Sequence, residues 1–300
     1  MSGETTRQSP PLHVVIVAYG SSVPLRACLE SLACTDPDGS TFTTTVVDNS
    51  SSELTRQLVE GFGHRYIDPG RNLGFAAGVN RALQLVSGTQ SDVMLMNPDA
   101  TIRAAAVRTL HETLHLEADT ACVAPAQKGE DGPAKVSWPF PSPSAAWLEA
   151  FGLSRLIRGH EFLIGSILLI KAAALADVGL FDERFFLYAE EADWQMRAVA
   201  RGWEIRYIGD VQGFHAGAGT GGDRVTRFVH FHASQELLIR KHYGWTGWQS
   251  YRAASIFGAL IRSALAQQPQ RRAARERLRI MTSGPTTVAS TLRTPDESVV

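Results

Sequence analysis

The sequence predicts an α/β protein whose central sheet is mostly parallel and has helices on both faces. Apolar runs with little alternation recur at residues 13–19, 43–51 and 92–100, as expected for strands buried on both sides. Helical segments separate these runs, and such alternation favours parallel strands joined by crossover helices. With 300 residues, 44% of them apolar and 20% charged, the chain is large enough to bury such a sheet.

The first half of the chain predicts four strands with helices between them. The strand at 13–19 precedes a helix that Ser22 can cap, with Pro24 in its first turn. The strand at 43–51 leads into a helix over ELTRQLVEGF, and the short strand HRYI follows. A glycine-rich turn then enters the helix of PGRNLGFAAGVNRALQLV, before the strand at 92–100.

Polar side chains end three of these strands. Tyr19 follows the first strand, Asp48 ends the second, and Asp99 ends the strand at 92–100 within Asn97-Pro98-Asp99. Any one of them can be an ordinary turn residue. In open α/β sheets, however, ligands bind at the carboxyl ends of the strands, so the three together predict a binding site.

The second half is less regular. Residues 128–144 are rich in Pro, Gly and Ser and predict a long loop. The apolar run 162–170 predicts a buried strand and is too short to span a bilayer. A strand at 204–208 precedes a glycine-rich loop around His215, and a helical pattern begins at Val225.

Composition narrows the class of protein. The formal net charge of −1 provides no general attraction to nucleic acid. Cys28, Cys34 and Cys122 form no CxxC pair and are typical of reduced, buried thiols. The opening MSGETTRQSPPL is polar and unlike a signal peptide, so we expect a cytoplasmic protein.

The tail differs from the rest of the chain in charge. Seven arginines and one acid, Glu276, lie between Arg252 and Arg279. Two interpretations stay open: a solvated surface helix, or contact with anionic lipid at the inner face of the membrane.

His111 and His115 stand at i, i+4 in a helical segment, a spacing that can hold a metal ion. Because no third ligand accompanies them in sequence, we expect an exposed helix face.

An acid cluster follows an aromatic run in FDERFFLYAEEADWQMRAVARGW, residues 181–203. Glu190, Glu191 and Asp193 fit a helix N-terminus, which favours acids by a few tenths of a kcal/mol, roughly. That preference does not explain the aromatic residues directly before them. A carboxylate against apolar walls has a raised pKa, which suits a general base. Glu190 and Asp193 share a helix face with Arg197, whereas Glu191 points elsewhere.

The order VVIVAY, VVDNSS, RNLGFAAGVN, MLMNPDA, the acid cluster and a His in a glycine-rich loop resembles the family-2 inverting glycosyltransferases. The resemblance is greatest to the rhamnosyltransferase-like branch and covers roughly residues 13–243. It implies a GT-A fold with a Rossmann-like nucleotide-binding half at 13–125 and an acceptor half at 126–243. A flexible start at 1–12 and a basic helical tail at 244–300, disordered at its end, would flank this domain.

The resemblance also implies roles for particular residues. Glu191 takes the position of the catalytic base, where the family has Asp, beside Glu190 and Asp193. Asp99 and His215 would hold Mg²⁺ or Mn²⁺, with Asn97 replacing one carboxylate of the family's Asp-x-Asp motif. The residues expected to contact the nucleotide sugar are Ala18, Tyr19, Gly20, Asp48, Asn72, Gly74, Phe75, Asn80, Asn97, Pro98, Asp99, Gly165 and Arg197. Weaker matches, to the donor diphosphate or the acceptor, are His230, Ser234, Arg240 and Lys241.

The implied activity is transfer of a sugar, best rhamnose from dTDP-rhamnose, to a glycan, cell-wall or polyprenyl-linked acceptor. Galactofuranose or glucose transfer is an alternative. Contact with the inner membrane surface and a homodimer are left open, and no nucleic acid is expected. A nucleotidyltransferase would need a glycine-rich, Arg-containing loop after the first strand, where only Gly20 stands. A non-catalytic sugar-nucleotide-binding module would explain Asn97 and Glu191, and it differs by releasing no nucleoside diphosphate.

Overall fold

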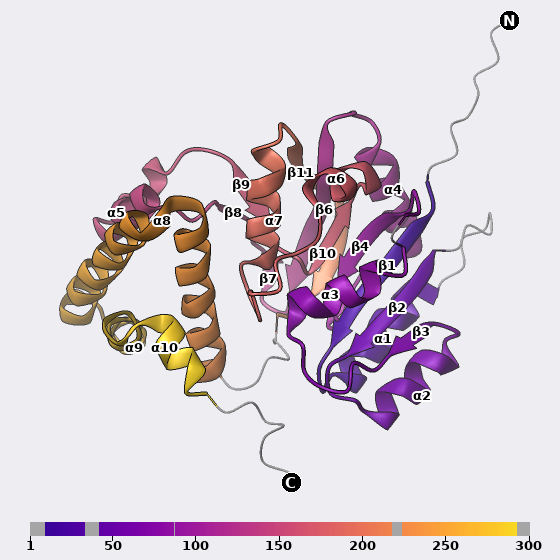
Figure 1. The fold of residues 1–300 in the computed structure, drawn as a ribbon, viewed down its shortest axis with the longest axis horizontal. Helices are drawn as coiled ribbons and strands as arrows, with labels where there is room; N and C mark the ends of the chain where they lie inside the picture. The colour runs from indigo at the N-terminus through magenta and orange to yellow at the C-terminus, as the bar shows by residue number, and fades with distance from the viewer. Residues whose placement is uncertain (1–9, 34–41, 87, 218–223, 293–300) are drawn as a thin grey trace, which may run out of the picture.

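A computed structural model describes residues 10–33, 42–86, 88–217 and 224–292, in two parts (Figure 1). One part is a sheet with helices on both faces, and the other is a group of helices beside it. Cys34, most of the expected flexible start, part of the glycine-rich loop and the expected disordered end lie outside the described residues.

The main sheet has mixed strand directions but a parallel nucleotide-binding half. Its order is β3 (Arg65–Ile67), β2 (Thr43–Asp48), β1 (Leu12–Ala18), β4 (Asp92–Met96), β10 (Ile167–Ile170), β6 (Thr120–Gly129), β11 (Glu204–His215) and β5 (Ala100–Thr101). The first four strands are parallel, as predicted. β10 is antiparallel to both β4 and β6, and β11 is parallel to β6. The chain order reverses between β1 and β4, the place where open α/β sheets bind ligands.

Successive residues of each buried strand supply two separate cores. In β1, Val14 and Ile16 pack towards α1 (Ser22–Ala33), α2 (Glu53–Gly61) and α4 (Ala104–Leu114). Val15 and Val17 pack towards α3 (Phe75–Leu83), α6 (Ala172–Val178) and α7 (Glu190–Val199). This alternation is why the strands read as continuous apolar runs.

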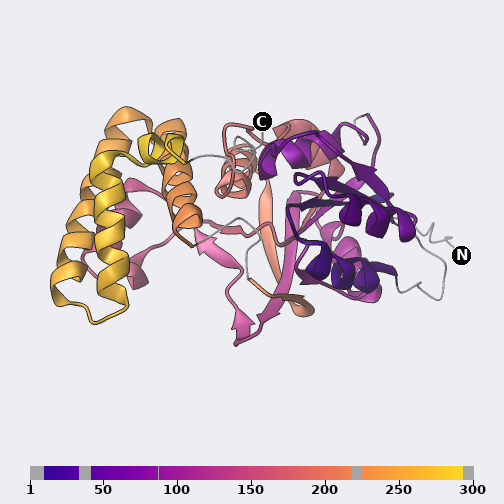
Figure 2. The same cartoon turned by 90° about the horizontal axis from the view of Figure 1, so that it is seen from below.

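The helical group contains α5 (Pro143–Ala150), α8 (Arg224–Leu265), α9 (Gln270–Ser283) and α10 (Pro285–Ser290) (Figures 1 and 2). It has its own core, in which Ile239, Trp248 and Met281 are buried with residues of α5. α8 bends at Gly244, where φ is +68°, next to the expected boundary at 243/244. α5 comes from the expected acceptor half, however, so the group is more than the tail.

Two expectations about the second half are wrong, and one predicted strand is longer than expected. Residues 128–144 are not one loop, because they contain β7 (Gly132–Ala134), paired with β6, and β8 (Ser137–Pro139), paired with β9 (Glu161–Leu163). The run 162–170 is not one strand, because residues 164–166 separate β9 from β10. The strand at 204–208 continues as β11 to His215, since its far end pairs with β6 and β5. These pairings join segments distant in sequence, which local composition cannot reveal.

Two of the three cysteines lie within the described residues, and both are buried as expected. Cys28 and Cys122 are buried and free, and burial, with the Asp99 carboxylate, raises the pKa of Cys28 to about 12. Among the described residues, no helix combines the length and the apolar character needed to cross a membrane.

Candidate active site

Asn97, Asp99 and His215 converge at the carboxyl end of β4. Asn97 begins a turn in which the Ala100 N–H donates to its carbonyl oxygen at 3.1 Å. β11 pairs with β5 so that His215 stands opposite Ala100. The His215 Nε2 atom therefore lies 3.2 Å from Asp99 Oδ1 and 3.2 Å from Asn97 Nδ2.

The side chains in this group fit a divalent cation. A single imidazole nitrogen cannot donate to Asp99 and accept from Asn97 at the same time. The other oxygen of Asp99, Oδ2, is buried and has no hydrogen-bond partner within the described part of the chain. A buried carboxylate oxygen and a nearby imidazole nitrogen are groups that can bind Mg²⁺ or Mn²⁺.

The acid cluster follows a strained turn. Tyr188 and Ala189 both have left-handed backbones, with φ of +70° and +67°, and α7 begins at the next residue. Each such residue costs on the order of 1 kcal/mol or more, and strain of this kind concentrates at functional sites. The Asp193 N–H then donates to the Ala189 carbonyl at 2.8 Å, which closes the first helical turn.

Glu190 and Glu191 lie in the apolar environment that the sequence predicts. Burial, reinforced by the neighbouring Glu191 charge, raises the pKa of Glu190 well above its ordinary value. Burial also raises the pKa of Glu191, although a hydrogen bond from the Gly165 N–H partly opposes it. One oxygen of each carboxyl, Oε2, is buried and unpartnered among the described residues. Either carboxyl could thus accept a proton.

Asp193 has a different environment, in which cations from two helices surround it, so the expected catalytic role stays a prediction. It is fully buried, and its oxygens lie 3.0 Å from Arg197 Nε, 2.7 Å from Lys241 Nζ and 2.8 Å from His242 Nε2. Burial opposes ionisation, but hydrogen bonds from His242 and Lys241 outweigh it and lower the pKa of Asp193. The carboxylate holds α7 against α8.

Arg197 also has protein partners, and its contact with the donor stays a prediction. Its Nη1 and Nη2 atoms donate to the carbonyl oxygens of Val178 and Leu180 at 2.7 and 2.8 Å, and its Nε atom bonds Asp193. The weaker candidates on α8 have protein partners too: Ser234 with Leu187, Arg240 with Glu236, Lys241 with Asp182, and His230 against the Phe186 ring.

The turn at residues 72–75 packs closely against Phe186 of the aromatic run. Gly74 has a φ of +79°, and its N–H donates to Asn72 Oδ1 at 2.9 Å. The Phe75 N–H donates to the Phe186 carbonyl at 2.8 Å. A Cβ atom at position 74 would lie 2.3 Å from that carbonyl oxygen, so only glycine fits this contact.

Asn49 is a buried polar residue beside the strand ends that the sequence argument missed. Its buried side chain donates to the Gly74 carbonyl at 2.9 Å and accepts from the Leu73 N–H at 3.3 Å. Its backbone N–H donates to the Ala18 carbonyl at 2.8 Å. It ties the ends of β1 and β2 to the turn at 72–75, and its place directly after Asp48 was the available signal.

Asp48 ends β2 as predicted but is fully bonded. Its oxygens accept from the Ser50 N–H and hydroxyl, the Ser52 N–H and the Tyr66 hydroxyl, at 2.5 to 3.1 Å. A carboxylate has about four acceptor sites, so a nucleobase would have to displace one of these donors. The Gly20 N–H donates to Ser50 Oγ, which joins the loop after β1 to the same network. Base contact by Asp48 stays a prediction.

Asn80 lies away from the strand ends. Its side chain donates to the Phe181 carbonyl and Glu183 Oε1 and accepts from the Phe181 N–H, at 2.8 to 3.1 Å. We therefore propose that Asn80 positions residues 181–183, and the expected contact with the donor stays untested.

Gly165 and Ser166 connect the acid cluster with the strand-end group. The Gly165 N–H bonds the Glu191 carboxylate, and the Ser166 carbonyl accepts from the Asn97 N–H at 2.9 Å. A Cβ atom at Gly165 would lie 3.9 Å from the Phe75 ring and 4.0 Å from Glu191 Cβ. Glu191 and Asn97 thus flank two consecutive residues, and the glycine leaves room beside the ring of Phe75.

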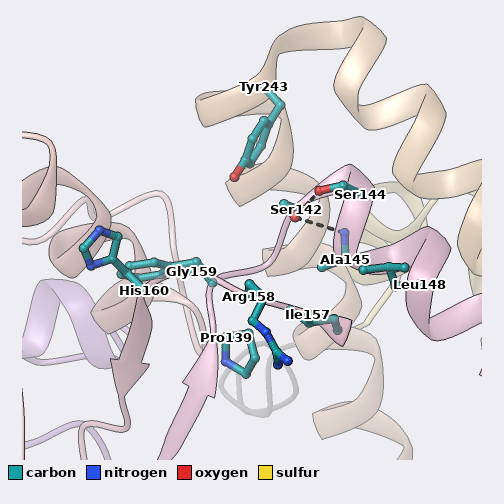
Figure 3. A pocket seen from close by; sticks show the side chains of 11 residues that line it. Pro139, Ser142, Ser144, Ala145, Leu148, Ile157, Arg158, Gly159, His160 and Tyr243 are labelled. Carbon is teal, nitrogen blue, oxygen red and sulfur yellow. Dashed lines mark hydrogen bonds between the residues drawn. The ribbon is translucent and has the colours of Figure 1, made fainter. Parts of the chain in front are cut away.

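A separate cavity of about 240 Å³ lies between β8, α5 and α8 (Figure 3). Arg158, His160 and Tyr243 are polar side chains of its wall. It adjoins β9, whose Leu163 exchanges two hydrogen bonds with the Gln195 side chain of α7, at 2.7 and 2.8 Å. The residues that line the cavity do not include Asp99, Glu191 or His215.

The fold is that of the GT-A glycosyltransferases. A mannosyltransferase from Pyrobaculum calidifontis, solved with GDP-Man and Mn²⁺, aligns with 95% of this chain and 84% of its own at a TM-score of 0.55 and 14% identity. TarS of S. aureus aligns with 94% of this chain and 90% of its own, at a TM-score of 0.52 and 16% identity. Similarity at this level of identity shows the fold alone.

The family model described as "Glycosyl transferase family 2" matches residues 13–174, more than half of the sequence. The chain therefore belongs to glycosyl transferase family 2 and is a glycosyltransferase. It is 27% identical to an N-acetylglucosaminyl-diphospho-decaprenol L-rhamnosyltransferase of Mycobacterium tuberculosis, over 90% of this chain and 97% of that protein. It is also 30% identical to a low-salt glycan biosynthesis hexosyltransferase of Haloferax volcanii, over 51% of this chain and 52% of that protein.

Proposed function

We propose that the protein transfers L-rhamnose, with inversion, from dTDP-rhamnose to a hydroxyl of a polyprenyl-diphosphate-linked sugar. Similarity to a rhamnosyltransferase with such an acceptor supports the proposal, because it extends over nearly the full length of both chains. The family itself is compatible with other sugars, including galactofuranose and glucose.

The observation that carries the proposal is the link through Gly165 and Ser166. It sets a buried carboxyl, Glu191, on one side and the strand-end group of Asn97, Asp99 and His215 on the other. Transfer of a sugar needs a base for the attacking hydroxyl and positive charge at the leaving diphosphate. This arrangement supplies residues suited to both tasks within one short stretch of the fold.

Glu191 is the proposed general base. Its raised pKa matches the task, because a base works best when its pKa approaches the working pH. The carboxylate would accept the proton of the acceptor hydroxyl as that oxygen forms a bond to the anomeric carbon and the nucleoside diphosphate departs. Gly165 N–H and the turn at Tyr188-Ala189 orient the carboxyl, and the neighbouring Phe75 ring limits access of water.

Asp99 and His215 are the proposed ligands of Mg²⁺ or Mn²⁺. The unpartnered Asp99 Oδ2 and the shared His215 Nε2 support this assignment. When bound, a divalent cation would take up negative charge that develops on the diphosphate. Asn97 contributes an amide in place of a second carboxylate, so Asp99 alone provides negative charge in this group.

Replacement of Glu191 by Gln tests the proposal. The amide keeps the shape but cannot accept the proton, so transfer should fall by about a hundredfold or more while dTDP-rhamnose binding persists. Release of dTDP in the presence of a polyprenyl-diphosphate-linked N-acetylglucosamine reports transfer, and thermal protection by the donor reports binding. Near-normal transfer by Glu191→Gln, with loss in the matched variant Glu190→Gln, would move the base to Glu190.

The same assays test the identity of the donor and the need for a metal ion. Thermal protection by a panel of nucleotide sugars should favour dTDP-rhamnose. EDTA should abolish transfer, and added Mn²⁺ or Mg²⁺ should restore it in the parent chain but not in Asp99→Asn. Full activity of Asp99→Asn in chelator would remove the metal assignment without affecting the base.

Membrane contact through the tail is a further part of the proposal, and the structure changes how it can be tested. α9 packs on α8, and Arg277 pairs with Glu149 at 2.8 Å, so removing the tail would expose a buried core. Arg272, Arg275 and Arg279 nevertheless lie exposed on one face of α9. Each basic residue at an anionic surface contributes about 1 kcal/mol at low salt.

Charge reversal is therefore a better test than truncation. Arg275→Glu with Arg279→Glu should abolish sedimentation with anionic liposomes at low salt. The pair Arg26→Glu and Arg103→Glu makes the same change of net charge at exposed positions of the sheet domain and should leave sedimentation unchanged. If the parent chain does not sediment with anionic liposomes at any salt concentration, a soluble acceptor becomes the better hypothesis.

A further inference from the structure

His111 and His115 do not form an exposed helix face, contrary to the sequence-based expectation. His111 is buried, and both rings direct Nε2 at one oxygen of Asp92, at 2.7 and 2.5 Å. Asp92 is the first residue of β4 and is fully buried. It is distant in sequence, which is why the spacing of the histidines did not reveal a third ligand.

We infer that Asp92, His111 and His115 form a Zn²⁺ site that is separate from the proposed donor-side metal. The ligand atoms all lie within 4.8 Å of one another. Two imidazoles and one carboxylate are a ligand set that zinc favours, with a fourth position left for water. His115 is 30% exposed, so water can reach the group from that side.

The present geometry is close to what zinc requires. Neighbouring ligand atoms in a tetrahedral zinc site are about 3.3 Å apart, since each bond is about 2.0–2.1 Å long. The two N···O distances of 2.7 and 2.5 Å must therefore open by less than about 1 Å. His111 lies in α4, and His115 is the residue that caps the end of this helix. The two rings meet edge to face at 5.4 Å, so a small rotation of the partly exposed His115 ring suffices.

A backbone hydrogen bond orients the Asp92 carboxylate, as is usual for a metal ligand. Asp92 Oδ1 accepts from the Ala172 N–H at 2.7 Å, which leaves Oδ2 for the two rings. Hydrogen bonds of this kind from outside the ligand set orient first ligands in known metal sites. The ammonium of Lys171, the nearest cation, donates instead to the carbonyls of Glu117 and Ala118.

The position of the group gives the ion a structural role. Asp92 begins β4 and Asp99 follows its other end, on the order of 20 Å apart along the chain at about 3.3 Å per residue. The ion would join the start of β4, the end of α4 and the first residue of α6, at the end of β4 opposite the proposed active site. Its loss would weaken folding before it affected the chemistry of transfer.

The test uses the full chain without a histidine tag, and Zn²⁺ alone as the probe. Every chain tested also contains Asp99→Asn, which removes the donor-side ligand. We expect one Zn²⁺ per chain by equilibrium dialysis and a rise in the unfolding midpoint of about 5 °C or more at a hundredfold excess over the dissociation constant. Co²⁺ should produce the visible absorption of a site with few ligands.

Two histidine variants separate this site from nonspecific binding. His115→Gln alters a partly exposed ligand and should lose both the bound ion and the thermal shift. His160→Gln makes the same change at an exposed histidine outside the group and should keep both. Absence of Zn²⁺ binding by the Asp99→Asn chain, or equal binding by His115→Gln, would overturn the inference in favour of a hydrogen-bonded Asp-His-His group.

Discussion

Replacement of Gly74 by Ala provides the sharpest test of how the nucleotide-binding half holds the acid cluster. Gly74 has φ +79° and ψ −175°, a backbone conformation that is almost exclusive to glycine and costs other residues about 1–3 kcal/mol. The new Cβ atom would also meet the Phe186 carbonyl oxygen at 2.3 Å and the Phe186 ring at 2.7 Å. The backbone must then move apart, which costs about 1–3 kcal/mol for overpacking and about 1 kcal/mol for the Phe75–Phe186 hydrogen bond.

These contributions amount to about 3–7 kcal/mol, a large share of the stability of an ordinary domain. Gly70→Ala is the matched control, because Gly70 has a φ of +74° but no atom within 4 Å of its missing Cβ. Urea unfolding should show a loss of about 1 kcal/mol for Gly70→Ala and several times more for Gly74→Ala. Transfer should fall only in Gly74→Ala. Equal losses of stability in the two variants would refute the close approach to Phe186.

Two further predictions concern the buried acids. Asp193→Asn should lower the free energy of unfolding by about 3 kcal/mol or more, because Lys241 and His242 lose a buried counter-charge. The pKa of Asp193 is lowered on folding, so its stabilisation exists above the ordinary value of 3.8 and is lost as pH falls; urea titrations should show the deficit shrinking in acid. Glu190→Gln should change the free energy of unfolding in the opposite direction. The pKa of Glu190 is raised on folding, so ionisation destabilises the native state, and the variant should be more stable than the parent near pH 8 by about 1 kcal/mol or more. The gain should vanish below the ordinary value of 4.5, and a pH-independent difference in thermal midpoint would contradict it.

Much of the nucleotide-binding half was predictable because its signals are local. The strands that contain Val14 and Met94 are apolar on both faces, and the polar groups at Asp48 and Asp99 follow them directly. The acid cluster was predictable for the same reason, since Glu190 and Glu191 adjoin the aromatic run in sequence. Burial of a short strand depends on its own composition, and hence these features could be found without knowing what packs against them.

The partners of individual side chains were not predictable, because they come from other parts of the chain. The sequence placed Asp193 on the face of Arg197 but did not reveal that Lys241 and His242 of α8 also contact it. Asn80 seemed suited to the donor, yet its bonds reach residue 181, about a hundred positions away. Local sequence carries no record of such contacts, and only the folded chain decides which polar groups remain free for a ligand.

By itself, the sequence determined the parallel nucleotide-binding half, the placement of Asn97-Pro98-Asp99 at a strand end, and the apolar setting of Glu190 and Glu191. The tertiary structure alone decided that β11 continues to His215, that α5 joins the tail helices, and that Asp92 lies between His111 and His115. The physical reason is the range of the interactions. Hydrophobic periodicity is a property of one element and can be read from its own residues. Strand pairing, helix packing and ion binding join elements that are distant in sequence, so the residues of one element do not indicate its partner.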